Sequence, residues 1–174
     1  MMTSGRVGLI ALAMLILTGS ASARDRAESK PPPLGPQEAE VVAAVMDPRT
    51  QQPTVVLRGK RDRRTVALAI GIAELTGIAV PLQGVTPPRP LTHDLFITMF
   101  GRLKVTLSRV VITDLRDDIY YATVYLTSGA GEMTLDARPS DAIALAIRAK
   151  VPVLVEDRVF DKGGSEPLAP RPHI

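Results

Sequence analysis

Two short segments of the sequence bring together residue types that can bind phosphate and move protons. Residues 88–95 read Pro-Arg-Pro-Leu-Thr-His-Asp-Leu, and residues 136–146 read Asp-Ala-Arg-Pro-Ser-Asp-Ala-Ile-Ala-Leu-Ala. Each segment contains an Arg-Pro pair followed by polar residues and an aspartate, at the predicted entrance of a helix. Because free N–H groups at a helix N-terminus attract anions and an arginine adds a bidentate partner, both segments favour phosphate binding.

Carboxylates at these helix entrances form a candidate catalytic site that would hold a divalent cation. Asp94, Asp136 and Asp141 belong to the two segments, and Glu74 lies in an upstream helix. Mg²⁺ and Mn²⁺ prefer such oxygen ligands, and phosphodiester hydrolysis gains from a metal that activates water. A structural interpretation stays open for Asp94 and Asp141, because an acid in the first turn of a helix offsets the helix macrodipole.

Three basic residues complete the candidate site. We expect Arg89 and Arg138 to bind the scissile phosphate, because the planar guanidinium fits phosphate oxygens better than an ammonium does. Alternatively, they bridge to nearby carboxylates or loop carbonyls. His93 is a candidate general acid or base, although a histidine at a helix start also serves as a capping or packing residue.

The composition excludes several classes of enzyme. The 174 residues contain no cysteine, which rules out thiol chemistry and the usual zinc cages. No G-x-S-x-G, H-E-x-x-H or phosphate-binding glycine loop occurs. The formal net charge of +3 is too small to predict nucleic-acid binding by itself, and three Phe, three Tyr and no Trp argue against an aromatic platform for stacking single-stranded bases.

The candidate residues lie in a chain whose apolar pattern indicates both strands and helices. Strands are predicted over residues 40–46, 54–58, 65–70, 105–115, 120–127, 132–136 and 151–155, and helices over 71–82, 90–102 and 139–150. With an offset of 67 residues the two halves repeat, so that Glu74 falls opposite Asp141. We therefore predict an α+β fold with a duplicated β-β-β-α unit, a mainly antiparallel sheet and helices packed on it.

The two ends of the sequence are predicted to lie outside this domain. Arg6, an aliphatic run over residues 7–17 and the Ala21-Ser22-Ala23 pattern indicate a signal peptide. Because a lipoprotein anchor needs cysteine, we expect an exported protein, periplasmic or secreted, without a membrane anchor after cleavage. The predicted organisation is a signal peptide over residues 1–23, a flexible proline-rich spacer over 24–38, the folded domain over 39–162 and a mobile tail over 163–174.

A basic turn joins two of the predicted strands. Arg58, Lys60, Arg61, Arg63 and Arg64 stand there against a single acid, Asp62. Such a cluster would give salt-sensitive affinity for a phosphate backbone. The alternative is a solvated hairpin whose edge charges discourage aggregation.

The two helix-entrance segments, with Ile70-Gly71 and Glu74 upstream, resemble the signature of the bifunctional nuclease domain family of bacteria, archaea and plants. The resemblance runs from about residue 40 to residue 159. It implies a nucleic-acid partner, cleavage of DNA and RNA as in some plant members, and self-association into homo-oligomers. The family usually has an Ala-rich helix after the glutamate, whereas Leu-Thr-Gly-Ile-Ala-Val-Pro follows Glu74 here, which predicts a shorter or kinked first helix.

Two functional hypotheses follow from the sequence. The first is an exported, metal-dependent nuclease of low sequence specificity, in which the carboxylates hold Mg²⁺ or Mn²⁺, the arginines hold phosphate and His93 moves the proton. The second is a non-catalytic binding or assembly module, in which the Arg-Pro segments form a salt-bridge lock between the two repeats.

Overall fold

The structure, a computed structural model, describes residues 35–165; the predicted signal peptide, most of the predicted spacer and residues 166–174 lie outside this part of the chain. Its elements are β1 (Gln37–Met46), β2 (Pro53–Gly59), β3 (Thr65–Ala69), α1 (Ile72–Leu82), α2 (Thr92–Arg102), β4 (Thr106–Arg116), β5 (Ile119–Ser128), β6 (Gly131–Ala137), α3 (Pro139–Ala149), β7 (Val153–Val155), α4 (Asp157–Gly163) and β8 (Gly164–Ser165). Within the described residues, no helix is long and apolar enough to cross a membrane.

The strands of residues 35–165 form one sheet with the order β6-β5-β4-β7-β1-β2-β3-β8. Neighbouring strands are antiparallel, except that β7 runs parallel to β4. With helices packed on this mainly antiparallel sheet, the predicted α+β class is confirmed. The short strand β7 lies between β4 and β1 and therefore joins the two halves of the sheet.

Each half of the sheet belongs to one β-β-β-α unit. The first unit is β1-β2-β3-α1 and the second is β4-β5-β6-α3, with α2 between them. The two ends of α1 coincide with those of α3 at the predicted offset of 67 residues. The expectation of a shortened α1 is wrong, because Pro81 stands in the last turn, where a proline interrupts few helical hydrogen bonds.

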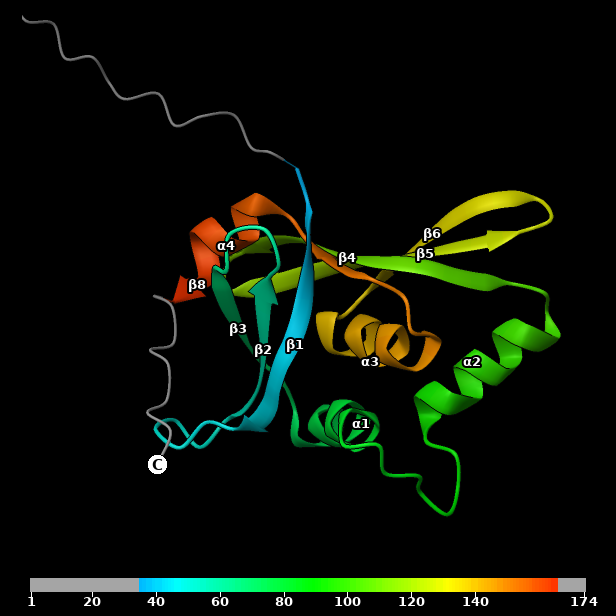
Figure 1. Ribbon diagram of the computed structural model, residues 1–174, viewed down its shortest axis with the longest axis horizontal. Helices are drawn as coiled ribbons and strands as arrows, with labels where there is room; N and C mark the ends of the chain where they lie inside the picture. Colours follow the sequence, from blue (N-terminus) through cyan, green and yellow to red (C-terminus); the bar gives the residue numbers. More distant parts are fainter. Residues whose placement is uncertain (1–34, 166–174) are drawn as a thin grey trace, which may run out of the picture. The chain divides into compact units, whose positions relative to one another are not determined.

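Helix α3 occupies the middle of the helical layer, with α1 and α2 packed beside it (Figure 1). Ala142, Ala144 and Ala146 are completely buried along this helix. Their small side chains favour helix formation and let the neighbouring elements approach closely. In contrast, α2 has no buried residue.

The sheet coils so that strands that are not neighbours in it come together. The hydroxyl of Tyr120 on β5 donates to the carbonyl oxygen of Ala67 on β3 at 3.3 Å. Helix α4 packs against both β3 and β4, and its Val159 and Phe160 complete the core. The sequence did not predict α4 or β8, which include the first residues of the expected tail.

Two element boundaries also differ from the sequence prediction. Strand β1 begins at Gln37, inside the expected spacer, because Gln37 is buried and its side-chain amide donates to Asp62 at 2.9 Å. Helix α2 begins at Thr92 instead of Pro90, because Leu91 is extended and its backbone N–H donates to Asp94 Oδ2 at 2.7 Å. Asp94 thus caps the helix from its first turn.

Candidate active site

A cleft of about 480 Å³ lies where the first turns of three helices approach the edge strand β6. Its polar lining consists of Glu74 from α1, Thr92 and His93 from α2, Asp136 from β6, and Arg138 and Asp141 at the start of α3. Five of the residues predicted for a site, Glu74, His93, Asp136, Arg138 and Asp141, therefore meet at one cleft.

The repeat places two carboxylates at equivalent positions beside this cleft. Glu74 is the third residue of α1, and Asp141 is the third residue of α3. Arg138, the extended residue before α3, is followed by Pro139, whose fixed φ suits the first helical position. The Arg-Pro-Ser-Asp sequence thereby holds arginine and aspartate on the same side of the helix entrance.

Arg138 joins the two carboxylates. Its Nη1 lies 2.7 Å from Glu74 Oε1, and its Nε and Nη2 donate to Asp141 at 2.7 and 3.2 Å. These bonds, those to Asp141 first, raise the pKa of the Arg138 guanidinium. Although partial burial acts in the opposite direction, hydrogen bonds from Arg138 and His93 lower the pKa of the Asp141 carboxyl. The bridge predicted as one interpretation of Arg138 is therefore present.

His93 forms the other contact of Asp141. Its Nε2 lies 3.2 Å from Asp141 Oδ1, and its side chain is only 15% exposed. The Cε1–Nδ1 edge of the ring, next to Nε2, packs over Gly77 of α1, where an added Cβ would lie 3.0 Å from His93 Cε1. A side chain larger than that of glycine would therefore press on the imidazole at this point.

Asp94 lies outside the cleft lining and belongs to a separate pair. Its Oδ1 accepts a hydrogen bond of 2.5 Å from Arg148 Nε. Partial burial tends to raise the pKa of Asp94, but Arg148 and the backbone N–H of Leu91 lower it further than burial raises it. This aspartate caps α2 and connects it with α3, which agrees with the structural interpretation of its position.

Arg148 is the residue of this region that the sequence analysis did not single out. Its side chain is 7% exposed, and its Nη1 donates to the carbonyl oxygens of Gly77 and Ala144 at 2.7 and 2.9 Å. A signal was present in the sequence, because Pro81 leaves the carbonyl of Gly77 without its usual helical donor. The sequence does not show which side chain donates to this carbonyl instead, because that depends on how the helices pack.

The remaining predicted residues differ in their surroundings. Asp136 lies at the edge of the cleft, but its side chain is on the face of β6 opposite Leu135 and Ala137, because successive residues of a strand face opposite sides. Within residues 35–165 its carboxylate has no hydrogen bond or ion pair. Arg89 is exposed in the loop before α2 and does not line the cleft. Among the described residues, no three acidic or histidine side chains are grouped as a metal site. The set Glu74, Asp94, Asp136 and Asp141 thus does not form one group within residues 35–165, and cation binding stays a prediction.

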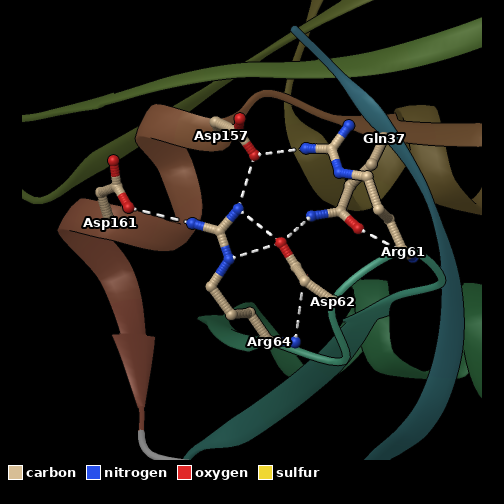
Figure 2. Close-up of polar contacts among 6 residues, drawn as sticks. All are labelled: Gln37, Arg61, Asp62, Arg64, Asp157 and Asp161. Carbon is tan, nitrogen blue, oxygen red and sulfur yellow. Dashed lines mark hydrogen bonds and ion pairs between the residues drawn. The ribbon is translucent and has the colours of Figure 1, made fainter. Parts of the chain in front are cut away.

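The basic turn between β2 and β3 is bound to carboxylates. Arg58 and Arg63 pair with Glu40, and Lys60 pairs with Glu38. Arg61 lies 2.8 Å from Asp157 of α4, and Arg64 lies 2.7 Å from Asp62 and 2.9 Å from Asp161; Figure 2 shows Arg64 between these two acids. These pairs tie the turn to β1 and α4, so the turn does not present five free cations to a phosphate backbone.

Comparisons with known proteins agree with this architecture. A family described as the bifunctional nuclease domain matches residues 55–167. An uncharacterized protein of Mycobacterium tuberculosis (strain H37Rv) is 37% identical over 127 residues, which are 73% of this chain and 76% of the relative.

Two proteins of Oryza sativa subsp. japonica are also similar. Bifunctional nuclease 1 is 34% identical over 94 residues, which are 52% of this chain and 28% of the rice protein. Bifunctional nuclease 2 is 28% identical over 124 residues, which are 68% of this chain and 38% of the rice protein. The family match covers more than half of the sequence and includes both helix-entrance segments. The chain therefore belongs to the bifunctional nuclease domain family.

Proposed function

We propose that the protein hydrolyses phosphodiester bonds of DNA or RNA with low sequence specificity. The observation that carries this proposal is the convergence of Glu74, His93, Arg138 and Asp141 on one cleft, with Asp136 at its edge. Clefts of roughly 300–1,000 Å³ with a few convergent polar groups are the usual sites of small-ligand chemistry. Family membership supports nucleic acid as the partner.

The contacts at the cleft suggest a role for each polar group. The hydrogen bond between His93 and Asp141 makes the pair, rather than His93 alone, the unit that accepts and returns a proton. Arg138 uses three of the five N–H groups of a guanidinium on Glu74 and Asp141, and the other two can bind a phosphate oxygen. The side chain of Arg138 is 64% exposed, so a substrate can reach it.

A requirement for Mg²⁺ or Mn²⁺ remains part of the proposal, as does a role for Asp94 and Arg89. A cation at Glu74 or Asp141 would have to compete with Arg138, which already binds both carboxylates. The mechanism proposed for the chain's own residues therefore includes no step at a metal, and the metal requirement is left to experiment.

The test is cleavage of single- and double-stranded DNA and RNA by the purified protein. Reactions contain Mg²⁺, Mn²⁺ or EDTA, and Asp141→Ala is compared with Glu132→Ala. Glu132 is an exposed acid on the same strand as Asp136 and lies outside the cleft. We expect cleavage to be lost in Asp141→Ala and kept in Glu132→Ala. Equal activity of the two variants would show that the cleft is not the active site.

A non-catalytic binding or assembly module is the second candidate. Arg138 favours it, because this residue links Glu74 of the first repeat with Asp141 of the second, as a salt-bridge lock would. In that case no preparation cleaves nucleic acid above the Asp141→Ala background. The variant would still lower the melting temperature, because Asp141 holds both Arg138 and His93.

Export and self-association are proposed on separate grounds. The predicted signal peptide supports export to the periplasm or the medium. The exposed apolar side chains of Leu95, Met99 and Leu103, which repeat every four residues along α2, support a homo-oligomer. Light scattering of the purified protein and of Leu103→Glu tests the second point, with a smaller particle expected for the variant.

A further inference from the structure

A second hollow, of about 330 Å³, adjoins the cleft at Arg138. Arg138 and Glu74 line both spaces, so their ion pair stands between the two. The other residues that line the second hollow come from β3 and the segment after it, from the turn before β5 and the start of that strand, and from the first turn of α3. A path therefore leads out of the candidate active site across Arg138.

Ser140 contributes an unused hydroxyl to this second hollow. The residue is 6% exposed and lines the second hollow but not the cleft. Within residues 35–165 its hydroxyl has no hydrogen-bond partner. No side-chain oxygen in this part of the chain is both sealed from solvent and without a partner. The hydroxyl of Ser140 is therefore open to the second hollow, where a ligand can supply the partner that the protein does not.

The backbone at the start of α3 adds a second donor. The first N–H groups of a helix have no acceptor within the helix. Pro139 has no N–H, so the first such group in α3 belongs to Ser140, and it has no acceptor within residues 35–165. The N–H of Asp141, in contrast, donates to the carbonyl oxygen of Arg138 at 3.1 Å. Two donors of Ser140 thus coincide with the positive end of an 11-residue helix.

The ligand that fits these groups is a phosphate. It accepts several hydrogen bonds, and it carries the negative charge that a helix N-terminus and an arginine attract. Arg138 is 64% exposed beside the two donors, although it also binds two carboxylates. Asp118 is the one acid lining the second hollow that Arg138 does not bind. Because Asp118 is exposed, water screens its repulsion of a phosphate.

We propose that the second hollow binds a phosphate group, which accepts hydrogen bonds from the hydroxyl and the backbone N–H of Ser140. This inference rests on the proposed hydrolysis of nucleic acid and deepens it. The group is a phosphate of the substrate strand, next to the phosphate that is cleaved in the cleft. The strand crosses Arg138, and a substrate needs at least two phosphates to occupy the whole site.

NMR titration of the isotope-labelled protein with inorganic phosphate tests the site itself. We expect the backbone amide signal of Ser140 to shift and Ser140→Ala to weaken phosphate binding about five-fold. Alanine suits this helix entrance, because Ala73 stands at the equivalent position of the first repeat. Since the hydroxyl binds no group of residues 35–165, the melting temperature of Ser140→Ala should equal that of the unchanged protein.

Two further variants control for the hydroxyl and for the charge. Ser108→Ala removes a hydroxyl that donates to the carbonyl oxygen of Tyr125 at 3.1 Å, outside both spaces, and phosphate binding should stay unchanged. Asp118→Asn removes a repelling charge and should tighten phosphate binding about two-fold. Asp118 has a φ of 60°, which asparagine also adopts, so this variant keeps the turn.

Short strands that resist cleavage test where this phosphate belongs in the substrate. A phosphorothioate dinucleotide of thymidine has one linkage, and the trinucleotide has two. We expect the trinucleotide to bind about five-fold more tightly than the dinucleotide, and this advantage should disappear in Ser140→Ala. If Ser140→Ala weakens binding of inorganic phosphate but the trinucleotide has no advantage, the site takes free phosphate, and the assignment to the strand is overturned.

The outcomes separate this inference from the proposed function. If Ser140→Ala binds phosphate and the trinucleotide as the unchanged protein does, the inference is overturned, and cleavage lost in Asp141→Ala still supports a nuclease. Phosphate binding that depends on Ser140 in a protein that cleaves no nucleic acid would overturn the proposed function and keep the phosphate site. A large fall in the melting temperature of Ser140→Ala would show that the hydroxyl is structural, which also overturns the inference.

Discussion

The guanidinium of Arg148 donates a hydrogen bond of 2.7 Å to the carbonyl oxygen of Gly77, in a different helix. In a regular helix this carbonyl would accept the N–H of residue 81, but Pro81 has none. Arg148 of α3 thus completes the hydrogen bonding of α1, and it also binds Asp94 of α2. One buried side chain therefore connects the three helices that form the cleft.

Replacing Arg148 should destabilise the fold. Arg148→Met removes the donor to Asp94 Oδ1 and to the carbonyl of Gly77, and we expect the free energy of unfolding to fall by roughly 2–4 kcal/mol. Urea unfolding measures the change. Arg102→Met, at an exposed arginine in the last turn of α2, should stay within about 0.5 kcal/mol of the unchanged protein. Similar losses in the two variants would contradict this role of Arg148.

The relation between Arg148 and Pro81 can be tested by a double-mutant cycle. Pro81→Ala restores a helical N–H for the carbonyl of Gly77, so Arg148→Met should cost about 1 kcal/mol less in this background. Urea unfolding of the four proteins gives the coupling energy. Additive effects would mean that the arginine does not replace the missing helical donor.

Gly77→Ala should disturb the cleft even though alanine favours helices. The added Cβ would lie 3.0 Å from His93 Cε1, so the ring that holds the hydrogen bond to Asp141 must shift by a few tenths of an ångström. Gly101→Ala in α2 is the control, because its Cβ would meet no atom within 4 Å. We expect Gly101→Ala to raise the free energy of unfolding, measured with urea, by about 0.5–1 kcal/mol. Gly77→Ala should not show this increase. We also expect the imidazole NMR signals of His93 to change in Gly77→Ala and to stay unchanged in Gly101→Ala.

The bridge between Glu74 and Arg138 should contribute little to stability. Arg138 is 64% exposed, and solvent screens exposed ion pairs. A cycle of Glu74→Gln and Arg138→Gln should give a coupling energy of about 0.2–1 kcal/mol in urea unfolding. A coupling of several kcal/mol would instead favour the salt-bridge lock over a site that keeps Arg138 accessible to substrate.

Stability should decrease in acid because of Asp94 and Asp141. Burial acts to raise both pKa values, but hydrogen bonds, from Arg148 to Asp94 and from Arg138 to Asp141, lower them further. Such a carboxylate stabilises the fold above its unfolded pKa, about 3.9, and loses this contribution as pH falls through its lower folded pKa. The free energy of unfolding, measured by urea from pH 7 to pH 3, should fall below about pH 4. The fall should be smaller in Asp94→Asn, and an equal fall would exclude Asp94 as a cause.

Export predicts a specific N-terminus. If residues 1–23 are a signal peptide, the protein recovered from the periplasm or medium of an expressing bacterium begins at Arg24. Mass spectrometry of that protein measures this directly. Ala23→Arg should block cleavage, because signal peptidase needs a small residue there. Recovery of the unprocessed chain from the cytoplasm in both cases would contradict export.

The sequence predicted much of the fold because its signals are local. The pattern of apolar residues predicted the strands β1 to β6 and also β7. The offset of 67 residues predicted that α1 and α3 are equivalent. Helix α4 and β8 were missed, because residues 157–165 contain two glycines and few apolar residues. They are held by distant partners, such as the contacts of Asp157 with Arg61 and Arg64.

The candidate site was predictable in residue type but not in geometry. The Arg-Pro-Ser-Asp segment correctly placed Arg138 and Asp141 together, since both stand at one helix entrance. Sequence spacing alone does not show that Asp94 turns away to Arg148, or that Arg138 reaches Glu74 of the other repeat. These choices depend on how α1 and α2 pack beside α3.

The position of β7 determines when the domain can be completed during synthesis. Val153 pairs with both Ala39 and Val110, so the strand that joins the two half-sheets leaves the ribosome only after both repeats have done so. A nascent chain that ends after α3 holds both repeats but lacks the strand between β4 and β1. Pairing over such a sequence distance is slow, because the loop entropy is lost before the contacts form. The two half-sheets therefore stay unjoined until residues 153–155 are available to pair with both of them.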